Sequence, residues 1–359
     1  MFNPEEKLLL TLLRSPVDYP EITELIKCGI DWDKLLLLAA DHRVLPTIYK
    51  RLKSQFSEIV PVSSLLRFKA SNQQNTKANF ARSGQLIKLL SKLKAESIPV
   101  IAYKGMALAS FAFGDSSLRQ YGDIDLFVKK TDFQRVKAAM VSAGCSPAWK
   151  LDGSQEAAVL KHHYEFPFEY GDNKTLIEVH WDFMESFFAF DFDVEGVWDR
   201  VETVDLYGHK VKTLSPEDYL LVLASHGGKH FWKRISWIQD ISQIIENKAI
   251  NWNEVIDRGI ETDSLRMVMI GCYLASRTFG TSLNTRVEEK ISADNLTRDL
   301  GSWFFESMFS EEREPSEWRK MAAVHLKLRE RYRTKLKYCL GLLSTKAIDS
   351  LFMPMGRPR

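Results

Sequence analysis

The sequence predicts an α+β protein in which a small mixed sheet is flanked by helical regions. Apolar residues recur at helical spacing before about residue 95 and again after Ser215, whereas short strand-like runs alternate with helices between them. We therefore expect three parts: an N-terminal helical region (1–95), a catalytic core (96–212) and a C-terminal helical domain (213–359).

The composition is that of an ordinary globular protein and argues against a general nucleic-acid binder. The chain has 359 residues, with 49 Lys and Arg against 47 Asp and Glu, so its formal net charge is only +2. A nucleic-acid-binding domain usually carries a strongly basic surface. Local basic surface remains compatible with this balance.

Cysteine use and the N-terminal sequence predict a cytoplasmic protein. The four cysteines (Cys28, Cys145, Cys272 and Cys339) form no CxxC pair, which is typical of a reducing compartment. The first residues, MFNPEEKLLL, carry acids where a signal peptide needs positive charge. No apolar run approaches the ~18 residues that cross a bilayer, so we expect no membrane association.

The first ninety residues read as packing helices without visible chemistry. Apolar stripes run from Pro4 to about Phe56, with Asp31 as a helix cap, and a long helix is expected from Ser63 to about Lys94.

The core begins with a strand, a Lys-Gly step and a helix. The strand is expected at Ile98–Tyr103, Lys104 and Gly105 follow it, and a helix carries residues 106–113. A glycine directly after a strand lets backbone N–H groups approach a phosphate closely.

Two carboxylates mark the next strand. Asp123 and Asp125 are two residues apart and precede Leu126-Phe127-Val128, so in a strand they share one face. Two adjacent carboxylates repel each other unless a cation neutralises them, and Mg²⁺ is typically held by one or two carboxylates together with substrate phosphates.

A third carboxylate is expected on a neighbouring strand. The runs HHYEFPFEY and TLIEVHWDF are joined through Gly171-Asp172-Asn173, a hairpin signal. In the second run Glu178, His180 and Asp182 share one face. Glu178 therefore joins the site if this strand lies beside that of Asp123.

From Ser215 onward the chain is predicted to be mostly helical. Ser215-Pro216-Glu217-Asp218 is a strong helix start, and the helical segment extends to about Asn247 with an expected break at Gly227-Gly228. A basic stretch from Trp318 to Leu340 either attracts an acidic acceptor such as RNA or forms a solvated amphipathic face. Its interleaved leucines favour the second reading.

With these residues, the chain resembles the DNA polymerase β-like nucleotidyltransferase superfamily and, within it, the family labelled uncharacterised nucleotidyltransferase. The resemblance rests on YKGMAL (103–108), LRQYGDIDLFV (118–128), LIEVHW (176–181) and SHGGKHFWKRISWIQD (225–240). An ordered set of Lys-Gly, Arg, Asp-x-Asp and Glu is far more specific than Asp-x-Asp alone.

The resemblance implies that Asp123, Asp125 and Glu178 are catalytic residues that hold divalent metal, Mg²⁺ or Mn²⁺. Gly105 would replace the glycine of the superfamily's Gly-Ser turn, although Met106 stands where the serine would be. Lys104 would add charge at the phosphates.

Five further residues are assigned to nucleotide binding by the same resemblance. Arg119 would reach the triphosphate or pair with a site carboxylate, and the later segment would line the cleft through His226, Lys229, His230 and Asp240. An alternative is that Trp237 is core and Asp240 satisfies a neighbouring charge. A zinc site at His226 and His230 is disfavoured because HGGKH lacks the glutamate of HExxH.

The resemblance implies a two-metal transfer of a nucleoside monophosphate from an NTP such as ATP to an unidentified acceptor, which is a small molecule, a protein or RNA. The alternatives are a catalytically inactive nucleotide- or partner-binding protein on the same fold, and a toxin-like enzyme that modifies tRNA or protein. Fold alone does not decide among them.

Overall fold

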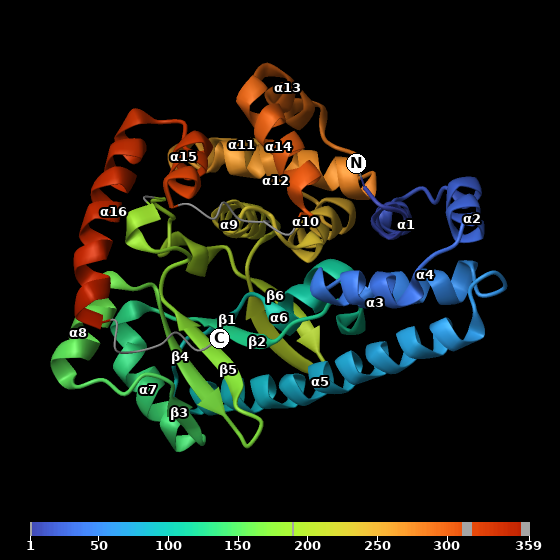
Figure 1. The fold of residues 1–359 in the computed structure, drawn as a ribbon. Helices are drawn as coiled ribbons and strands as arrows, with labels where there is room; N and C mark the ends of the chain where they lie inside the picture. The colour runs from blue at the N-terminus through green and yellow to red at the C-terminus, as the bar shows by residue number, and fades with distance from the viewer. Residues whose placement is uncertain (1, 189, 311–317, 353–359) are drawn as a thin grey trace.

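The computed structural model describes residues 2–188, 190–310 and 318–352, and it places a five-stranded sheet among helices (Figure 1). The predicted α+β class with helical regions before and after the sheet is confirmed. Within these residues no helix is long and apolar enough to cross a membrane.

The N-terminal region consists of four short helices and one very long one: α1 (Pro4–Leu13), α2 (Tyr19–Lys27), α3 (Trp32–Asp41), α4 (Leu45–Gln55) and α5 (Val62–Ala95). The expected cap is present, because the Asp31 carboxylate accepts hydrogen bonds from the first backbone N–H groups of α3. Helix α5 runs the length of the molecule beneath the sheet (Figure 1).

The sheet has the strand order β1-β2-β5-β4-β3. Its strands are β1 (Ile101–Ala102), β2 (Asp123–Phe127), β3 (Cys145–Pro147), β4 (Glu165–Tyr170) and β5 (Thr175–His180). Strands β2 and β5 are parallel, and the other neighbours are antiparallel. Glu178 was expected to join the site only if its strand lay beside that of Asp123. This condition is met, because β5 lies directly beside β2.

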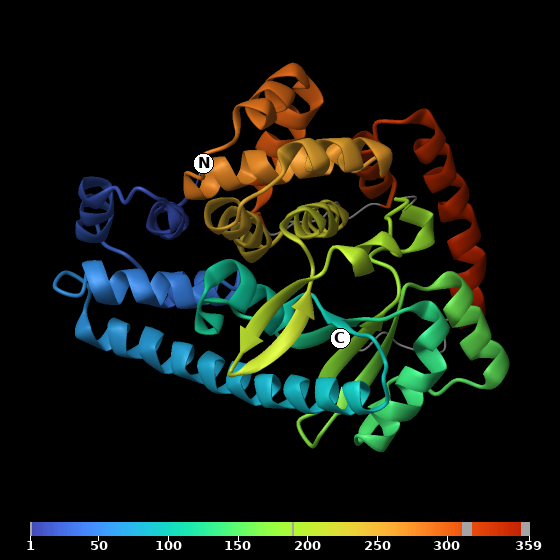
Figure 2. The same cartoon turned by 180° about the vertical axis from the view of Figure 1, so that it is seen from behind.

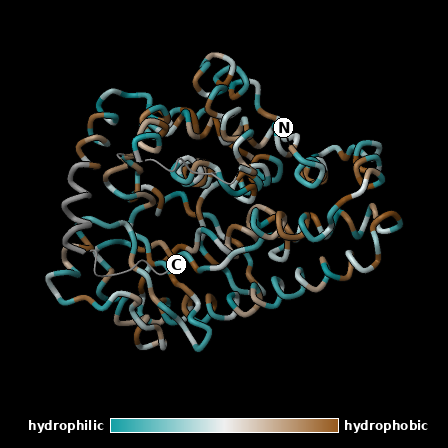
Figure 3. Tube along the Cα trace, viewed as in Figure 1, coloured by the Kyte–Doolittle hydropathy of each residue, from teal (hydrophilic) through white to brown (hydrophobic). Residues whose placement is uncertain are grey.

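The two faces of the sheet have different partners. One face carries Ile124, Leu126, Ile177 and Val179, all buried, and is covered by α5 and by α7 (Phe133–Ser142), as the view from behind shows (Figure 2). The opposite face carries the carboxylates and is turned toward the C-terminal helices. In Figure 3 hydrophobic and hydrophilic residues alternate along the helices, as expected for elements that bury one side.

The core differs from the sequence expectation in five places. The first strand is only two residues long, because Val100 and Tyr103 form no ladder pair with β2. Strand β3, helix α8 (Gly153–His162) and the hairpin of β6 (Glu202–Leu206) and β7 (His209–Thr213) had no counterpart in the expectation. After Gly105, helix α6 (Gly105–Leu108) continues as one π-helical turn over Ala109–Phe113.

The C-terminal region begins with α9 (Pro216–Lys229) and α10 (Ile235–Asn247), which lie above the carboxylate-bearing face (Figure 1). The outer helices are α11 (Trp252–Glu261), α12 (Leu265–Phe279), α13 (Thr285–Ala293), α14 (Asn295–Ser307), α15 (Trp318–Leu328) and α16 (Tyr332–Phe352).

The predicted break at Gly227-Gly228 is wrong, since α9 passes through both glycines and ends at Lys229. A Cβ on Gly227 would lie 2.5 Å from the Trp232 ring, and one on Gly228 would lie 2.8 Å from the Met267 sulfur. These glycines therefore permit close packing within a continuous helix rather than ending it.

Candidate metal and nucleotide site

The predicted carboxylates meet on one face of the sheet. Asp125 of β2 is the direct register partner of Glu178 of β5, and Asp123 lies two pairs earlier, opposite Leu176. Asp125 is 3% exposed, whereas Asp123 and Glu178 are only partly buried. A buried carboxylate is thus flanked by two that reach the surface of the cleft.

Two basic side chains contact the buried carboxylate. The Lys104 Nζ donates to Asp125 Oδ1 at 3.0 Å, and His180 Nε2 lies 3.3 Å from the same oxygen and 3.5 Å from Glu178 Oε2. On its other side, His180 Nδ1 lies 3.2 Å from Glu165 Oε2. The imidazole is therefore surrounded by three carboxylates.

Burial and these neighbours act on the pKa values in opposite directions. Burial opposes a charged imidazole, but Asp125, Glu178 and Glu165 outweigh it and raise the pKa of His180 to about 9. For Asp125, burial is outweighed by Lys104 and His180, which hold its pKa below the ordinary value. Burial, together with the charges of Asp125 and Glu178, raises the pKa of Asp123.

The cluster is left incompletely satisfied, which is the property a cation site requires. Within the described part of the chain, the buried Asp125 Oδ2 has no hydrogen-bond partner. A small cavity of about 10 Å³, bounded by Lys104, Gly105, Asp123 and Asp125 among others, lies beside it. Ligand atoms of Asp125, Glu178 and His180 lie within 4.8 Å of one another. These oxygen and nitrogen donors fit a divalent metal.

His180 is the member of this group that the sequence assignment did not include. It follows Glu178 by two residues on the same strand, so strand alternation already placed it on the carboxylate face. That alternation was the available signal, and an imidazole is itself a metal ligand.

Gly105 occupies the turn between β1 and α6 in a conformation that favours glycine. Its φ is +52°, and a Cβ there would lie 3.3 Å from the Asp123 carbonyl oxygen. The next side chain, Met106, is 3% exposed and contacts Ser83 of α5. The departure from the Gly-Ser pattern therefore directs a buried thioether into the core, and the cavity retains the backbone of the turn.

Arg119 and Asp240 form an ion pair with each other. The guanidinium donates from Nε to Asp240 Oδ1 at 2.7 Å and from Nη2 to Oδ2 at 2.8 Å, and Nη1 reaches the Gly105 carbonyl oxygen at 3.4 Å. Despite burial, Asp240 raises the pKa of Arg119. This two-pronged pair fixes the Gly105 turn to α10.

Helix α9 lies on the carboxylate-bearing side of the sheet (Figure 1). The His226 and His230 rings are 4.7 Å apart, and each contacts the Trp237 ring. Burial, reinforced by nearby lysines, lowers the pKa of both histidines, that of His230 to about 2. Lys229 instead binds both Glu185 oxygens at 2.7 Å. These histidines are therefore held neutral, and Lys229 is engaged by a carboxylate.

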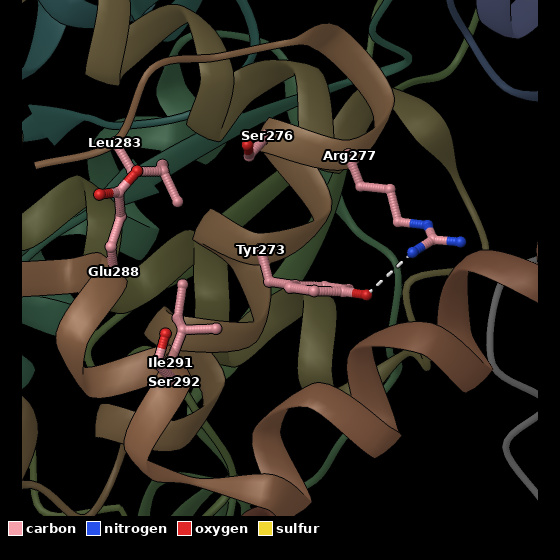
Figure 4. A pocket seen from close by; sticks show the side chains of 7 residues that line it. All are labelled: Tyr273, Ser276, Arg277, Leu283, Glu288, Ile291 and Ser292. Atoms are coloured by element: carbon pink, nitrogen blue, oxygen red, sulfur yellow. Dashed lines mark hydrogen bonds between the residues drawn. The ribbon is translucent and has the colours of Figure 1, made fainter.

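A larger surface hollow of about 440 Å³ lies elsewhere, between α12 and α13 (Figure 4). In it Arg277 donates to the Tyr273 hydroxyl at 3.1 Å. This hollow shares no residue with the carboxylate cluster, and none of the predicted site residues lines it.

The family of the chain follows from a match to a known family model. The model of the family described as uncharacterised nucleotidyltransferase matches residues 29–280, which is well over half of the chain. The chain belongs to this nucleotidyltransferase family. The match extends from α3 through the carboxylate-bearing strands to α12 and includes every predicted site residue.

Three solved structures resemble this nucleotidyltransferase in part. The antibiotic-resistance factor ANT(2'')-Ia matches in its solution structure (14% identity, TM-score 0.37, covering 51% of this chain and 91% of that one). It also matches in its complex with adenylyl-2''-tobramycin (15%, 0.37, 51% and 97%). An antigenic nucleotidyltransferase-like protein from Paracoccidioides brasiliensis matches at 16% identity and TM-score 0.32, covering 59% and 90%. At these scores the likeness carries no conclusion about substrates.

No curated protein matches the chain by sequence.

Proposed function

We propose that this protein is a metal-dependent enzyme that transfers a nucleoside monophosphate from an NTP to an acceptor. The observation that carries the proposal is the buried Asp125, whose second oxygen has no hydrogen-bond partner among the residues that the structure describes. Asp125 lies in register with Glu178 of the adjacent strand and shares its own strand with Asp123. Three converging carboxylates are costly to bury without a cation, whereas a binding module has no need for them.

Asp123, Asp125 and Glu178 would hold Mg²⁺, or Mn²⁺ in its place, and His180 would become a further ligand once the metal displaced the proton that its raised pKa retains. When bound, the metal neutralises the phosphates and lowers the barrier to displacement at phosphorus. The backbone at Gly105 would approach the phosphates, and Arg119 with Asp240 would keep that turn in position from α10.

The transfer is a single displacement at the α-phosphorus. An acceptor oxygen forms a new bond to this phosphorus while the bond to the bridging oxygen breaks, and pyrophosphate leaves with that electron pair. The acceptor's proton passes to Glu178, whose side chain is 24% exposed and so reaches the cleft. Orientation and charge neutralisation supply most of the catalysis in such reactions.

The proposed nucleotide site is bounded on the α9 side by His226, Lys229 and His230. The neutral histidines, together with the Trp237 ring that they contact, provide uncharged aromatic groups that suit a nucleobase or an acceptor ring. The acceptor is a small molecule, a protein or RNA.

The test is label transfer from each α-³²P-labelled NTP, ATP first, with Mg²⁺ or Mn²⁺ and a cell extract as the acceptor pool. The comparison is between wild type and a variant with both Asp123→Asn and Asp125→Asn. Label attached to a molecule by wild type alone supports the proposal and identifies the acceptor class. Metal-dependent NTP binding without transfer would indicate the inactive binding protein instead.

A further inference from the structure

Three arginines outside the predicted site lie near one another, two of them close to Asp123. Arg43 lies in the connection from α3 to α4, Arg82 in α5 and Arg234 just before α10. They come from the N-terminal helices, from the long helix beneath the sheet and from the C-terminal domain. None was singled out from the sequence.

Arg43 and Arg82 lie at the turn that precedes β2 and at the cavity beside it, and Arg234 is within electrostatic range of Arg43. The Arg43 guanidinium lies 4.0 Å from where a Cβ of Gly122 would be, one residue before Asp123. Arg82 lines the small cavity together with Lys104, Gly105 and Asp123. Burial first, and then the positive charges of Arg234, Arg119 and Arg82, lower the pKa of Arg43, which places these groups within electrostatic range of one another.

The three guanidinium groups lack the partners that buried arginines elsewhere in this protein have. No hydrogen bond or ion pair to a residue in the described part of the chain engages any of them, and the buried Arg82 Nε has no acceptor. Arg234 is 5.7 Å from the Trp237 ring as its one close aromatic contact among these residues. Arg119, by contrast, is neutralised by both oxygens of Asp240.

The backbone that carries two of these arginines is strained. Arg43 itself has φ +56°, and the two residues that precede Lys233 and Arg234, Phe231 and Trp232, have φ +55° and +53°. Such conformations are energetically unfavourable for a residue with a side chain, and they occur often at ligand sites. The fold therefore keeps three partly buried cations near one free carboxylate, which favours a multiply charged anion between them.

We propose that Arg43, Arg82 and Arg234 bind the triphosphate chain of the nucleotide donor, so that both helical regions complete the phosphate site at the Gly105 turn. The identity of the anion rests on the proposed function, because the same cavity contains Gly105 and the Asp123 and Asp125 carboxylates. Guanidinium groups bind phosphate oxygens through two parallel hydrogen bonds, which makes arginine well suited to this position.

The test measures binding of inorganic tripolyphosphate by isothermal titration calorimetry in EDTA, so that neither the base nor a metal contributes. We expect wild type to bind it and ATP to compete with it. Each of Arg43→Gln, Arg82→Gln and Arg234→Gln should weaken binding about tenfold to a hundredfold. The matched control is Arg67→Gln in the same helix as Arg82, where the side chain is 56% exposed and pairs with Asp33, and it should bind as wild type does.

Lysine replacements provide a second series in case a glutamine variant does not fold. Arg→Lys keeps the charge but loses the two-pronged geometry, so we expect a smaller loss than for glutamine with the melting temperature retained. Equal binding by wild type and by folded arginine variants would overturn the inference, as would absence of binding by wild type. Simultaneous binding of ATP and tripolyphosphate would also overturn it, since the arginines would then serve an anionic acceptor.

This assay is independent of transfer. Arginine-dependent tripolyphosphate binding together with no label transfer would contradict the proposed enzyme while leaving the phosphate site intact. If folded arginine variants bind tripolyphosphate as wild type does and still transfer label, the proposed enzyme is supported and the arginine phosphate site is contradicted.

Discussion

Two buried carboxylates in this protein, Asp125 and Asp218, have similar burial but different surroundings. Asp218, 2% exposed at the start of α9, is satisfied at both oxygens: Arg200 reaches each of them, Arg258 binds Oδ1, and Ser215 donates to Oδ2 at 2.9 Å. Asp125 has Lys104 and His180 at one oxygen, and its other oxygen has no partner in the described structure.

The difference separates a carboxylate that holds the fold together from one kept ready for a ligand. A fully paired buried charge has no remaining capacity for a metal, whereas an orphaned buried oxygen costs stability unless something else binds it. Both residues have a second acidic residue nearby in the sequence and lie in or at the start of a regular element. Only the side chains that contact each carboxylate in the folded protein distinguish them.

The largest expected effect is on transfer. Asp125→Asn keeps the shape of the side chain but removes the charge that would hold the metal, and we expect a loss of about 10³-fold or more in label transfer. Asp218→Asn should retain transfer per folded molecule. Loss of transfer in both variants to the same extent would remove the distinction between the two carboxylates.

The free energy of unfolding should be affected in the opposite order, with Asp218→Asn more destabilising than Asp125→Asn. Asp218→Asn leaves Arg200 and Arg258 without their shared partner, so we expect the free energy of unfolding to fall by about 3–5 kcal/mol in urea titrations. Asp257→Asn, on the exposed side of α11, is the control and should change it by less than about 0.5 kcal/mol. A change in Asp218→Asn no larger than in this control would contradict the structural role.

The pair of Arg119 with Asp240 provides an intermediate case. Arg119→Lys keeps the charge but cannot donate to both Asp240 oxygens and to the Gly105 turn, so we expect a loss of about 1–3 kcal/mol in stability. The Gly105 turn should also be held less firmly in the position that binds phosphate, so KM for the NTP should rise more than kcat falls. Unchanged KM and stability together would show that the pair does not position the turn.

The smallest expected effect concerns a histidine whose surroundings are the opposite of those of His180. His325 is buried with Nδ1 2.9 Å from the Tyr338 hydroxyl and Nε2 3.1 Å from the Lys229 carbonyl oxygen, and burial lowers its pKa to about 4. Between pH 6.5 and 4 the unfolded chain therefore binds a proton that the folded protein does not.

Stability must fall as the pH is lowered through this window, by about 2 kcal/mol at pH 5 from His325 alone. His325→Gln should make the dependence shallower by that amount in unfolding experiments at pH 7 and pH 5. An unchanged slope would show that His325 titrates normally in the folded protein.

The parts of the fold that follow from local periodicity were predictable. The α9 start at Ser215-Pro216 and the β4–β5 hairpin are in the structure where the sequence signals lie. The pairing of Asp125 with Glu178 depended on β5 lying parallel to β2, a contact between strands about fifty residues apart that no local pattern specifies.

What escaped prediction was set by tertiary contacts. Gly227 and Gly228 look like helix breakers until Trp232 and Met267 occupy the space that their missing side chains leave. Arg119 was expected to reach the triphosphate or to pair with a carboxylate, and Asp240 to line the cleft or to satisfy a neighbouring charge. Only the fold shows that these two residues bind each other. Arg43, Arg82 and Arg234 come from three different regions of the chain, and only the tertiary fold brings them near one another.

The most direct test of the account is Mn²⁺ binding followed by electron paramagnetic resonance of the free ion. Wild type and Asp218→Asn should both bind Mn²⁺, and Asp125→Asn should lose the site. Binding by Asp125→Asn equal to that of wild type would contradict the claim that the unsatisfied carboxylate cluster is the metal site of this nucleotidyltransferase.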